Sequence, residues 1–192
     1  MKGRVKIVRQ EFAEAPEDDI VKITYNKRSR YVLGNEAVTA DEAAALQERM
    51  NAGDVIGIPV YAYVHSGSTI RCSDVGNPFK CRWDSGRSGL AYITTADAQR
   101  EWDLPSLRDV KERAESYIRN FVKTFDAYLK GEVYGYVAEK AVVDPDSGEV
   151  LDGEFEEEDA CWGFYGYDRN ESGMAEAIKQ YVDKGYEIVE ED

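Results

Sequence analysis

The chain has 192 residues and carries 38 acidic residues against 24 basic ones, which gives a formal net charge of −14. A chain of this length buries a substantial core, so we expect a single domain over residues 1–192. The negative charge repels polyanions, which argues against direct binding of duplex nucleic acid and favours partners with basic surfaces. No apolar run approaches the roughly 20 residues that cross a bilayer, so we expect no membrane association.

The amino-terminal residues and the cysteines are typical of a cytoplasmic protein. Residues 1–10 alternate charged residues with valine and isoleucine and lack the apolar core of a signal peptide. Cys72, Cys81 and Cys161 are odd in number, so we expect thiols instead of a disulfide framework. Cys72 and Cys81 with His65 offer three zinc ligands, but the short Cys-x2-Cys signature is absent. We therefore expect no metal and no cofactor.

The first half of the chain predicts short strands around one helix. Residues 5–8, 20–25 and 30–33 read as strands, with an acidic loop over residues 11–19. Thr39 and Glu42 form a capping box, and the helix that begins there ends near Gly53. Residues 55–65 alternate apolar residues with Tyr61, Tyr63 and His65, which predicts a strand, and residues 69–72 follow as its hairpin partner.

The second half predicts the longest helix of the chain and a further set of strands. After a loop over residues 73–88, a strand over 90–94 and a short helix to residue 102, apolar residues recur at helical spacing over residues 106–130. Strands follow over residues 133–140 and 161–167, then a helix over 173–184 capped by Ser172, and a strand over 186–189. This order predicts an α+β fold with a mainly antiparallel sheet, packed by one long helix and two or three shorter ones.

Polar chemistry concentrates in residues 58–89, which contain the only histidine. His65, Cys81 and Asp84 are the residue types of a nucleophile, a base and an orienting acid, so a small cysteine and histidine enzyme is one alternative. We expect no catalytic residue, because an isolated histidine on a strand is usually a packed residue with one hydrogen bond. Arg82, Trp83 and Arg87 are instead the amphipathic contacts that a binding loop displays.

Residues 142–160 contain nine carboxylates and no basic residue. A charge block of this kind predicts a flexible acidic connection between two strands, which keeps a protein in solution. It is also suited to dock on a basic groove as an anionic prong, and the candidate contacts for that role are Glu154, Glu156, Glu157, Glu158 and Asp159.

Four motifs resemble a family of accessory proteins carried by phages and mobile elements of Gram-positive bacteria. They are HSG from residue 65, PFKCRWDSG from residue 78, KGEVYGYV from residue 130 and CWGFYG from residue 161. The resemblance covers residues 60–92 and 131–173, about half of the chain. It implies a setting, because accessory genes of this kind often act against host defence, but it assigns no functional residues.

Charge and setting together predict an anti-defence protein of the host cell cytoplasm. It would inhibit a nucleic-acid-targeting system, CRISPR or restriction, by presenting its acidic surface to a basic host defence protein or nucleoprotein. The alternatives are the small enzyme and a module that sequesters a signalling nucleotide in an aromatic pocket. The sequence leaves open whether the chain forms a homo-oligomer.

Overall fold

The computed structural model describes residues 3–191, which adopt the predicted α+β fold class. Their strands form two mainly antiparallel sheets, one of four strands and one of five. The chain forms two compact units, which we call the split unit (residues 1–14 and 131–192) and the inserted unit (residues 15–130). In the sequence, the inserted unit lies between the two segments of the split unit.

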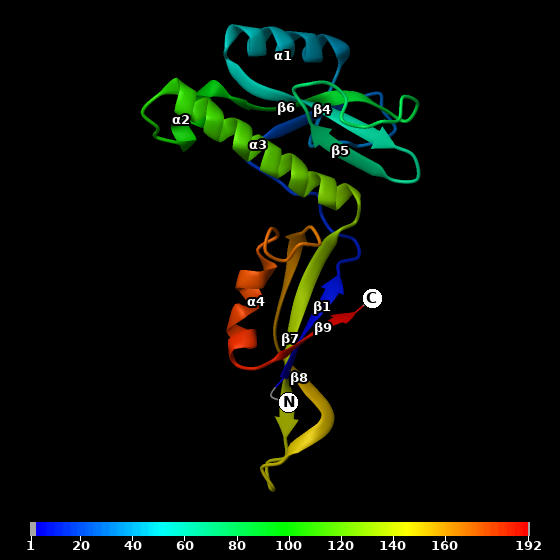
Figure 1. Cartoon of the computed structure of the whole chain (residues 1–192), viewed down its shortest axis with the longest axis vertical. Helices are drawn as coiled ribbons and strands as arrows, with labels where there is room; N and C mark the ends of the chain where they lie inside the picture. The colour runs from blue at the N-terminus through cyan, green and yellow to red at the C-terminus, as the bar shows by residue number, and fades with distance from the viewer. Residues whose placement is uncertain (1–2, 192) are drawn as a thin grey trace. The chain divides into compact units, whose positions relative to one another are not determined.

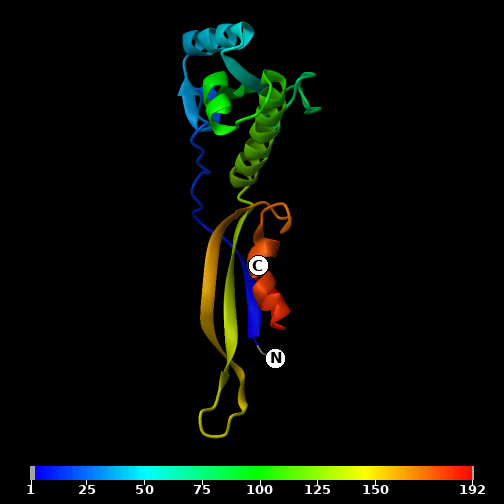
Figure 2. The same ribbon diagram turned by 90° about the vertical axis from the view of Figure 1, so that its left-hand side faces the viewer.

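The split unit contains the four-stranded sheet and one helix. Its elements are β1 (Gly3–Arg9), β7 (Val133–Val143), β8 (Val150–Tyr165), α4 (Met174–Asp183) and β9 (Glu187–Glu191). The strand order is β8-β7-β1-β9, with β1 parallel to β9 and the other neighbours antiparallel. Strands β7 and β8 form a long hairpin, and α4 lies on one side of the sheet (Figure 2).

Alternation along the strands builds the core of the split unit. Val5 and Ile7 of β1 pair with Ala138 and Tyr136 of β7, so all four side chains point to the same face. Met174, Ile178 and Tyr181 of α4 cover that face, and each is at most 4% exposed. Among the described residues of this unit, no helix covers the opposite face of the sheet.

The inserted unit contains the five-stranded sheet between helices (Figure 1). Its strands, in the order β3-β2-β6-β4-β5, are β2 (Lys22–Asn26), β3 (Glu36–Val38), β4 (Val55–Val64), β5 (Ser68–Cys72) and β6 (Ser85–Thr94). The helices are α1 (Ala40–Ala52), α2 (Thr95–Glu101) and α3 (Leu107–Leu129). Helix α1 begins at the predicted capping box, in which the Glu42 amide donates to the Thr39 hydroxyl and the Thr39 amide donates to the Glu42 carboxylate.

Helices α1 and α3 pack on opposite faces of the five-stranded sheet. Ile118, Phe121 and Phe125 of α3 lie in the larger core with the alternating apolar residues of β4, as the periodicity predicts. On the other face, Leu46 of α1 packs on a smaller cluster from β4 and β6. The buried Asp126 of α3 accepts the Ile70 amide at 2.8 Å, so the helix also covers the edge strand β5.

Three predicted local features are wrong. Residues 30–33 form no strand, and the Asn35 side chain that follows them accepts the Ile23 amide of β2 and donates to the carbonyl of Val21, just before β2. Most of the acidic connection is strand β8, since backbone pairing with β7 continues to Val150 and leaves only residues 144–149 as a turn. The cap of α4 is Gly173 in a left-handed conformation, and Ser172 does not cap the helix.

Within residues 3–191, no helix combines the length and the apolar character needed to cross a membrane.

Candidate functional site

The negative charge of the chain is concentrated in the split unit. By sequence, residues 1–14 and 131–192 hold 21 acidic and 8 basic residues, whereas residues 15–130 hold 17 acidic and 16 basic residues. The split unit therefore carries a formal charge of −13, and the inserted unit carries −1. An electrostatic role consequently belongs to the split unit, and the inserted unit is close to neutral.

Strand β8 displays the densest part of this charge at the edge of the four-stranded sheet. We call its carboxylates the acidic edge: Glu149, at the turn before β8, and Asp152, Glu154, Glu156, Glu157, Glu158 and Asp159. All are exposed except Asp159, which is half-buried. Pairing with β7 holds the charges in fixed positions, so they form an ordered row where a flexible loop was expected.

Some carboxylates of the acidic edge form ion pairs with neighbouring lysines, and others do not. Lys140 lies 3.2 Å from Glu156, and Lys184 lies 3.5 Å from Glu158. Glu154 and Glu157 make no ion pair with any residue that the structure describes. A basic partner can therefore pair with these two carboxylates without first displacing a lysine.

Tyrosine hydroxyls fix the inner end of the acidic edge. The Tyr181 and Tyr136 hydroxyls donate to Asp159 Oδ2 at 2.6 and 2.8 Å, and these bonds lower the pKa of the Asp159 carboxyl. The Tyr186 hydroxyl donates to Glu158 at 2.6 Å and lowers its pKa as well. Burial and the bond to Asp159 raise the pKa of Tyr136 to about 12, so this phenol remains a donor at neutral pH. Both carboxylates therefore stay ionised.

The acidic edge is a row of negative charge with a spacing set by the strand. An antiparallel strand rises about 3.4 Å per residue and its side chains alternate between the two faces, so successive carboxylates on one face of β8 stand roughly 7 Å apart. One strand of duplex DNA carries a charge about every 3.4 Å along its axis. Each face of β8 therefore presents a linear row of charge at about half that density.

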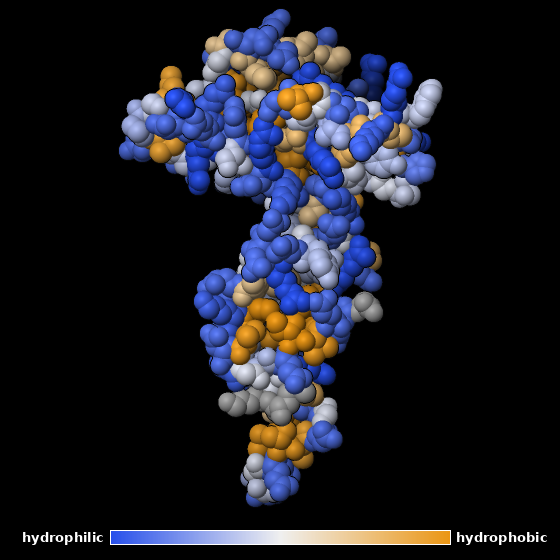
Figure 3. All heavy atoms as spheres, in the orientation of Figure 1, coloured by the Kyte–Doolittle hydropathy of each residue, from blue (hydrophilic) through white to orange (hydrophobic). Residues whose placement is uncertain are grey.

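Apolar groups lie beside the acidic edge. A small apolar cluster is visible towards the far end of the β7–β8 hairpin (Figure 3), where the paired residues Val143 and Val150 are 50% and 53% exposed. Trp162 is 46% exposed and lies against Gly135 of β7. A Cβ atom at position 135 would come within 2.2 Å of the Trp162 ring, so only glycine fits there.

In the inserted unit, the structure brings His65, Cys81 and Asp84 together. Asp84 Oδ2 lies 3.5 Å from His65 Nδ1 and accepts the Cys81 thiol at 3.3 Å. The Asp84 carboxylate therefore contacts both the imidazole and the thiol. In a catalytic triad, the imidazole lies between the nucleophile and the carboxylate. The three residues instead close the loop between β5 and β6, together with the Asn77 amide, which donates to Ser85 at 2.9 Å.

The three cysteines are thiols, and Cys161 is exposed while Cys72 and Cys81 are half-buried. Burial raises the pKa of Cys72 to about 11, which suppresses its thiolate at neutral pH. Within residues 3–191, no group of three or more histidine, cysteine, aspartate or glutamate side chains is placed to hold a metal ion.

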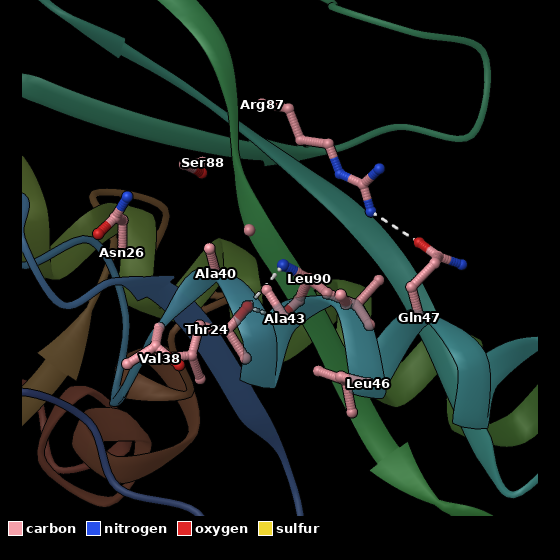
Figure 4. A pocket seen from close by; sticks show the side chains of 13 residues that line it. Thr24, Asn26, Val38, Ala40, Ala43, Leu46, Gln47, Arg87, Ser88 and Leu90 are labelled. Carbon is pink, nitrogen blue, oxygen red and sulfur yellow. Dashed lines mark hydrogen bonds between the residues drawn. The ribbon is translucent and has the colours of Figure 1, made fainter.

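The proposed binding-loop residues are exposed but face different surroundings. Trp83 is 94% exposed, and Arg82 is exposed next to it. Arg87 donates to Gln47 of α1 at 3.1 Å, at a hollow of about 430 Å³ (Figure 4). The lining of this hollow is mostly small or polar, and the residues labelled in Figure 4 are Thr24, Asn26, Val38, Ala40, Ala43, Leu46, Gln47, Arg87, Ser88 and Leu90.

Sequence reasoning missed the partners of Tyr61. Its alternation with Tyr63 and His65 was visible, but only the strand register shows that Arg71 and Arg87 flank Tyr61 on the neighbouring strands. Arg71 falls in the strand predicted over residues 69–72, but Arg87 falls in the loop predicted over residues 73–88, and the pairing depends on a register that the sequence does not specify.

No protein family, curated protein or solved structure matches this chain. The four sequence motifs nevertheless form two packed pairs, one in each unit. His65 of the first motif contacts Asp84 of the second, and Gly135 of the third lies opposite Trp162 of the fourth. The motifs therefore describe two local packing arrangements.

Proposed function

We propose that the protein is an inhibitor that docks its acidic edge on a basic, nucleic-acid-binding groove of a partner protein or nucleoprotein. The observation that carries this proposal is the ordered row of carboxylates on the edge strand β8, which pairing with β7 holds in fixed positions. A preorganised row binds with less loss of conformational entropy than a mobile acidic loop.

The setting implied by the sequence motifs narrows the partner. An accessory protein of a phage or mobile element benefits from blocking host defence, so the proposed targets are CRISPR effectors and restriction enzymes in the host cytoplasm. These enzymes expose basic grooves for nucleic acid, which the acidic edge complements in charge. The protein then acts by occupying the groove, without a chemical step of its own.

The arrangement around His65 gives less support to the enzyme alternative. The Cys81 thiol donates to a carboxylate, which cannot activate it as an imidazole would. A nucleotide-sequestering module would need an aromatic pocket, and none of the residues that line the hollow beside α1 is aromatic.

A cleavage assay with matched charge variants tests the proposed function. In the edge variant, Glu149→Gln, Asp152→Asn, Glu154→Gln and Glu157→Gln remove four exposed carboxylates that form no ion pair with the described residues. In the control, Glu17→Gln, Glu48→Gln, Glu101→Gln and Asp103→Asn remove four exposed carboxylates of the inserted unit. DNA cleavage by a guide-loaded CRISPR effector and by a restriction endonuclease is measured with each protein.

We expect the parent and the control to inhibit one of these enzymes and the edge variant to inhibit at least about tenfold less, with slower association and a shallower dependence on salt. Equal inhibition by the edge variant would contradict the role of β8. Equal loss in both variants would assign the effect to overall charge. No inhibition of either enzyme at micromolar protein would contradict the proposed function itself.

A further inference from the structure

Three strands of the inserted unit place an aromatic side chain between two arginines. Tyr61 of β4 pairs directly with Arg71 of β5 on one side and with Arg87 of β6 on the other. Residues that stand opposite each other in an antiparallel sheet project from the same face. Both arginines are exposed and Tyr61 is half-buried, so the row lies at the surface of the sheet.

Further aromatic rings continue this row along β4. Tyr63 and His65 follow Tyr61 at alternate positions, and the rings of Tyr63 and His65 are stacked with centroids 6.4 Å apart. The ring of Phe79, from the loop after β5, has its centroid 6.0 Å from the centroid of the Tyr63 ring. The Arg71 guanidinium lies 5.3 Å from the Phe79 ring centroid. We call Tyr61, Tyr63, His65, Arg71, Phe79 and Arg87 the stacking face.

The α1 helix leaves the stacking face uncovered. The cluster beneath α1 contains Val55, Leu90 and Tyr92, which lie at the other end of β4 and β6. Gln47 of α1 reaches only Arg87, whose guanidinium it holds at the boundary of the face. Half-buried aromatic rings and exposed arginines therefore lie together on the sheet, and the rings are not members of the core clusters.

The local charge of this surface differs from that of the whole chain. Residues 60–89 contain four basic residues, Arg71, Lys80, Arg82 and Arg87, against two acidic ones, Asp74 and Asp84. Asp74 is paired with Arg119 of α3, and Asp84 is bonded to His65 and Cys81. Trp83, which is almost fully exposed, follows Arg82 in the sequence and adds one more aromatic ring.

We propose that the stacking face binds single-stranded nucleic acid. Bases stack on tyrosine and tryptophan rings whatever their identity, and arginines beside the rings hold the phosphates between successive bases. A duplex keeps its bases inside and cannot use the rings, so the face discriminates against duplexes. This inference is independent of the acidic edge, because it concerns the other, nearly neutral unit.

Fluorescence anisotropy with end-labelled 12-mers of oligo-dT and oligo-U, and with a duplex of the same length, tests this proposal on the full-length protein. We expect both single strands to bind and the duplex to bind at least about tenfold more weakly. The affinity for single strands should fall with salt with a logarithmic slope of roughly −0.7 for each phosphate contacted. A difference between oligo-dT and oligo-U would show which of the two strands the face selects.

Substitutions then locate the binding site. Tyr61→Ala and the double variant Arg71→Ala with Arg87→Ala should each weaken binding by roughly ten- to a hundredfold, the range for loss of one stacked base. Trp83→Ala should weaken it as well, and its 94% exposure protects the fold if Tyr61→Ala fails to fold. The matched controls are Phe12→Ala, a 97% exposed ring of the split unit, and Arg108→Ala with Arg113→Ala on the exposed face of α3.

Undiminished binding by folded Arg71→Ala with Arg87→Ala and by Trp83→Ala would overturn the proposal. Equal affinity for the duplex would do so too, because it would show charge attraction without stacking. Absence of single-strand binding at low salt and micromolar protein would likewise reject it, while leaving the inhibition assay of the acidic edge unaffected.

Discussion

Individual carboxylates of one short acidic run have different physical roles. Asp159 receives two tyrosine hydroxyls on the helix-covered side of the sheet, whereas Glu157 stands at an exposed position without an ion pair among the described residues. The sequence presents them as equivalent members of one charge block. Substitution of Asp159 should therefore affect stability, and substitution of Glu157 should affect binding but not stability.

Asp159→Asn should lower the free energy of unfolding of the split unit by about 1 to 3 kcal/mol, because two hydrogen bonds to a charged acceptor are weakened. Glu157→Gln, as the matched control, should change it by less than about 0.5 kcal/mol. Urea denaturation of the two variants checks this difference. Equal stability of both variants would show that the tyrosine bonds contribute nothing to folding.

The same carboxylate should make stability dependent on pH in the acid range. The hydroxyls of Tyr181 and Tyr136 lower the pKa of Asp159 below its unfolded value of about 3.9. Its contribution is therefore complete above about pH 4 and disappears as the pH falls through the folded pKa. The gap in unfolding free energy between parent and Asp159→Asn should shrink between about pH 7 and pH 3, and a constant gap would contradict this assignment.

At the scale of elements, α3 organises the inserted unit. Its apolar stripe fills the larger core, and its Asp126 covers the β5 edge by accepting the Ile70 amide and the Thr69 hydroxyl. The outer edge strand β8 of the other sheet is protected differently, because its row of negative charges opposes pairing with another strand. The same charges can therefore serve both solubility and recognition.

Phe125→Ala tests the register of α3. Phe125 is 1% exposed, so truncation should cost about 3 to 5 kcal/mol in unfolding free energy. Leu107, the first residue of α3, is 63% exposed, and Leu107→Ala should cost less than about 0.5 kcal/mol. Thermal and denaturant unfolding measure both. Similar costs at the two positions would indicate a different helix register.

At the scale of the whole molecule, charge and aromatic surface are divided between two units. The split unit holds the acidic edge, and the inserted unit holds the stacking face. The points at which the chain leaves and re-enters the split unit are neighbours: the Gln10 amide donates to the Val133 carbonyl at 2.8 Å, and Arg9 Nε donates to the Gly131 carbonyl at 2.8 Å. The insertion therefore needs no rearrangement of that sheet.

Replacing residues 15–130 with a short glycine and serine linker should give a split unit that folds by itself. Its four strands and α4 supply a core that contains no residue of the inserted unit. We expect a cooperative urea transition and a circular dichroism spectrum with strand and helix signals. Residues 15–130, expressed alone, are measured in the same two ways. A broad, non-cooperative transition would show that the sheet requires the inserted unit.

Features that depend on neighbouring residues could be predicted from the amino-acid sequence. The capping box of Thr39 and Glu42, the alternation of β4 and the stripe of α3 follow from local periodicity, and together they specify the α+β class. The candidate residues of the acidic edge and of the loop at Trp83 were also visible, because charge and exposure follow from composition.

The way in which these elements combine could not be predicted from local patterns. The tertiary structure separates residues 15–130 from the two segments of the split unit, turns the acidic connection into an edge strand, and sets Tyr61 between Arg71 and Arg87. Each of these outcomes depends on pairing between strands distant in the chain, and a register shift of one residue would reverse the faces. Such pairing gains its free energy from contacts that no local sequence pattern encodes, so it emerges only when the whole sheet is assembled.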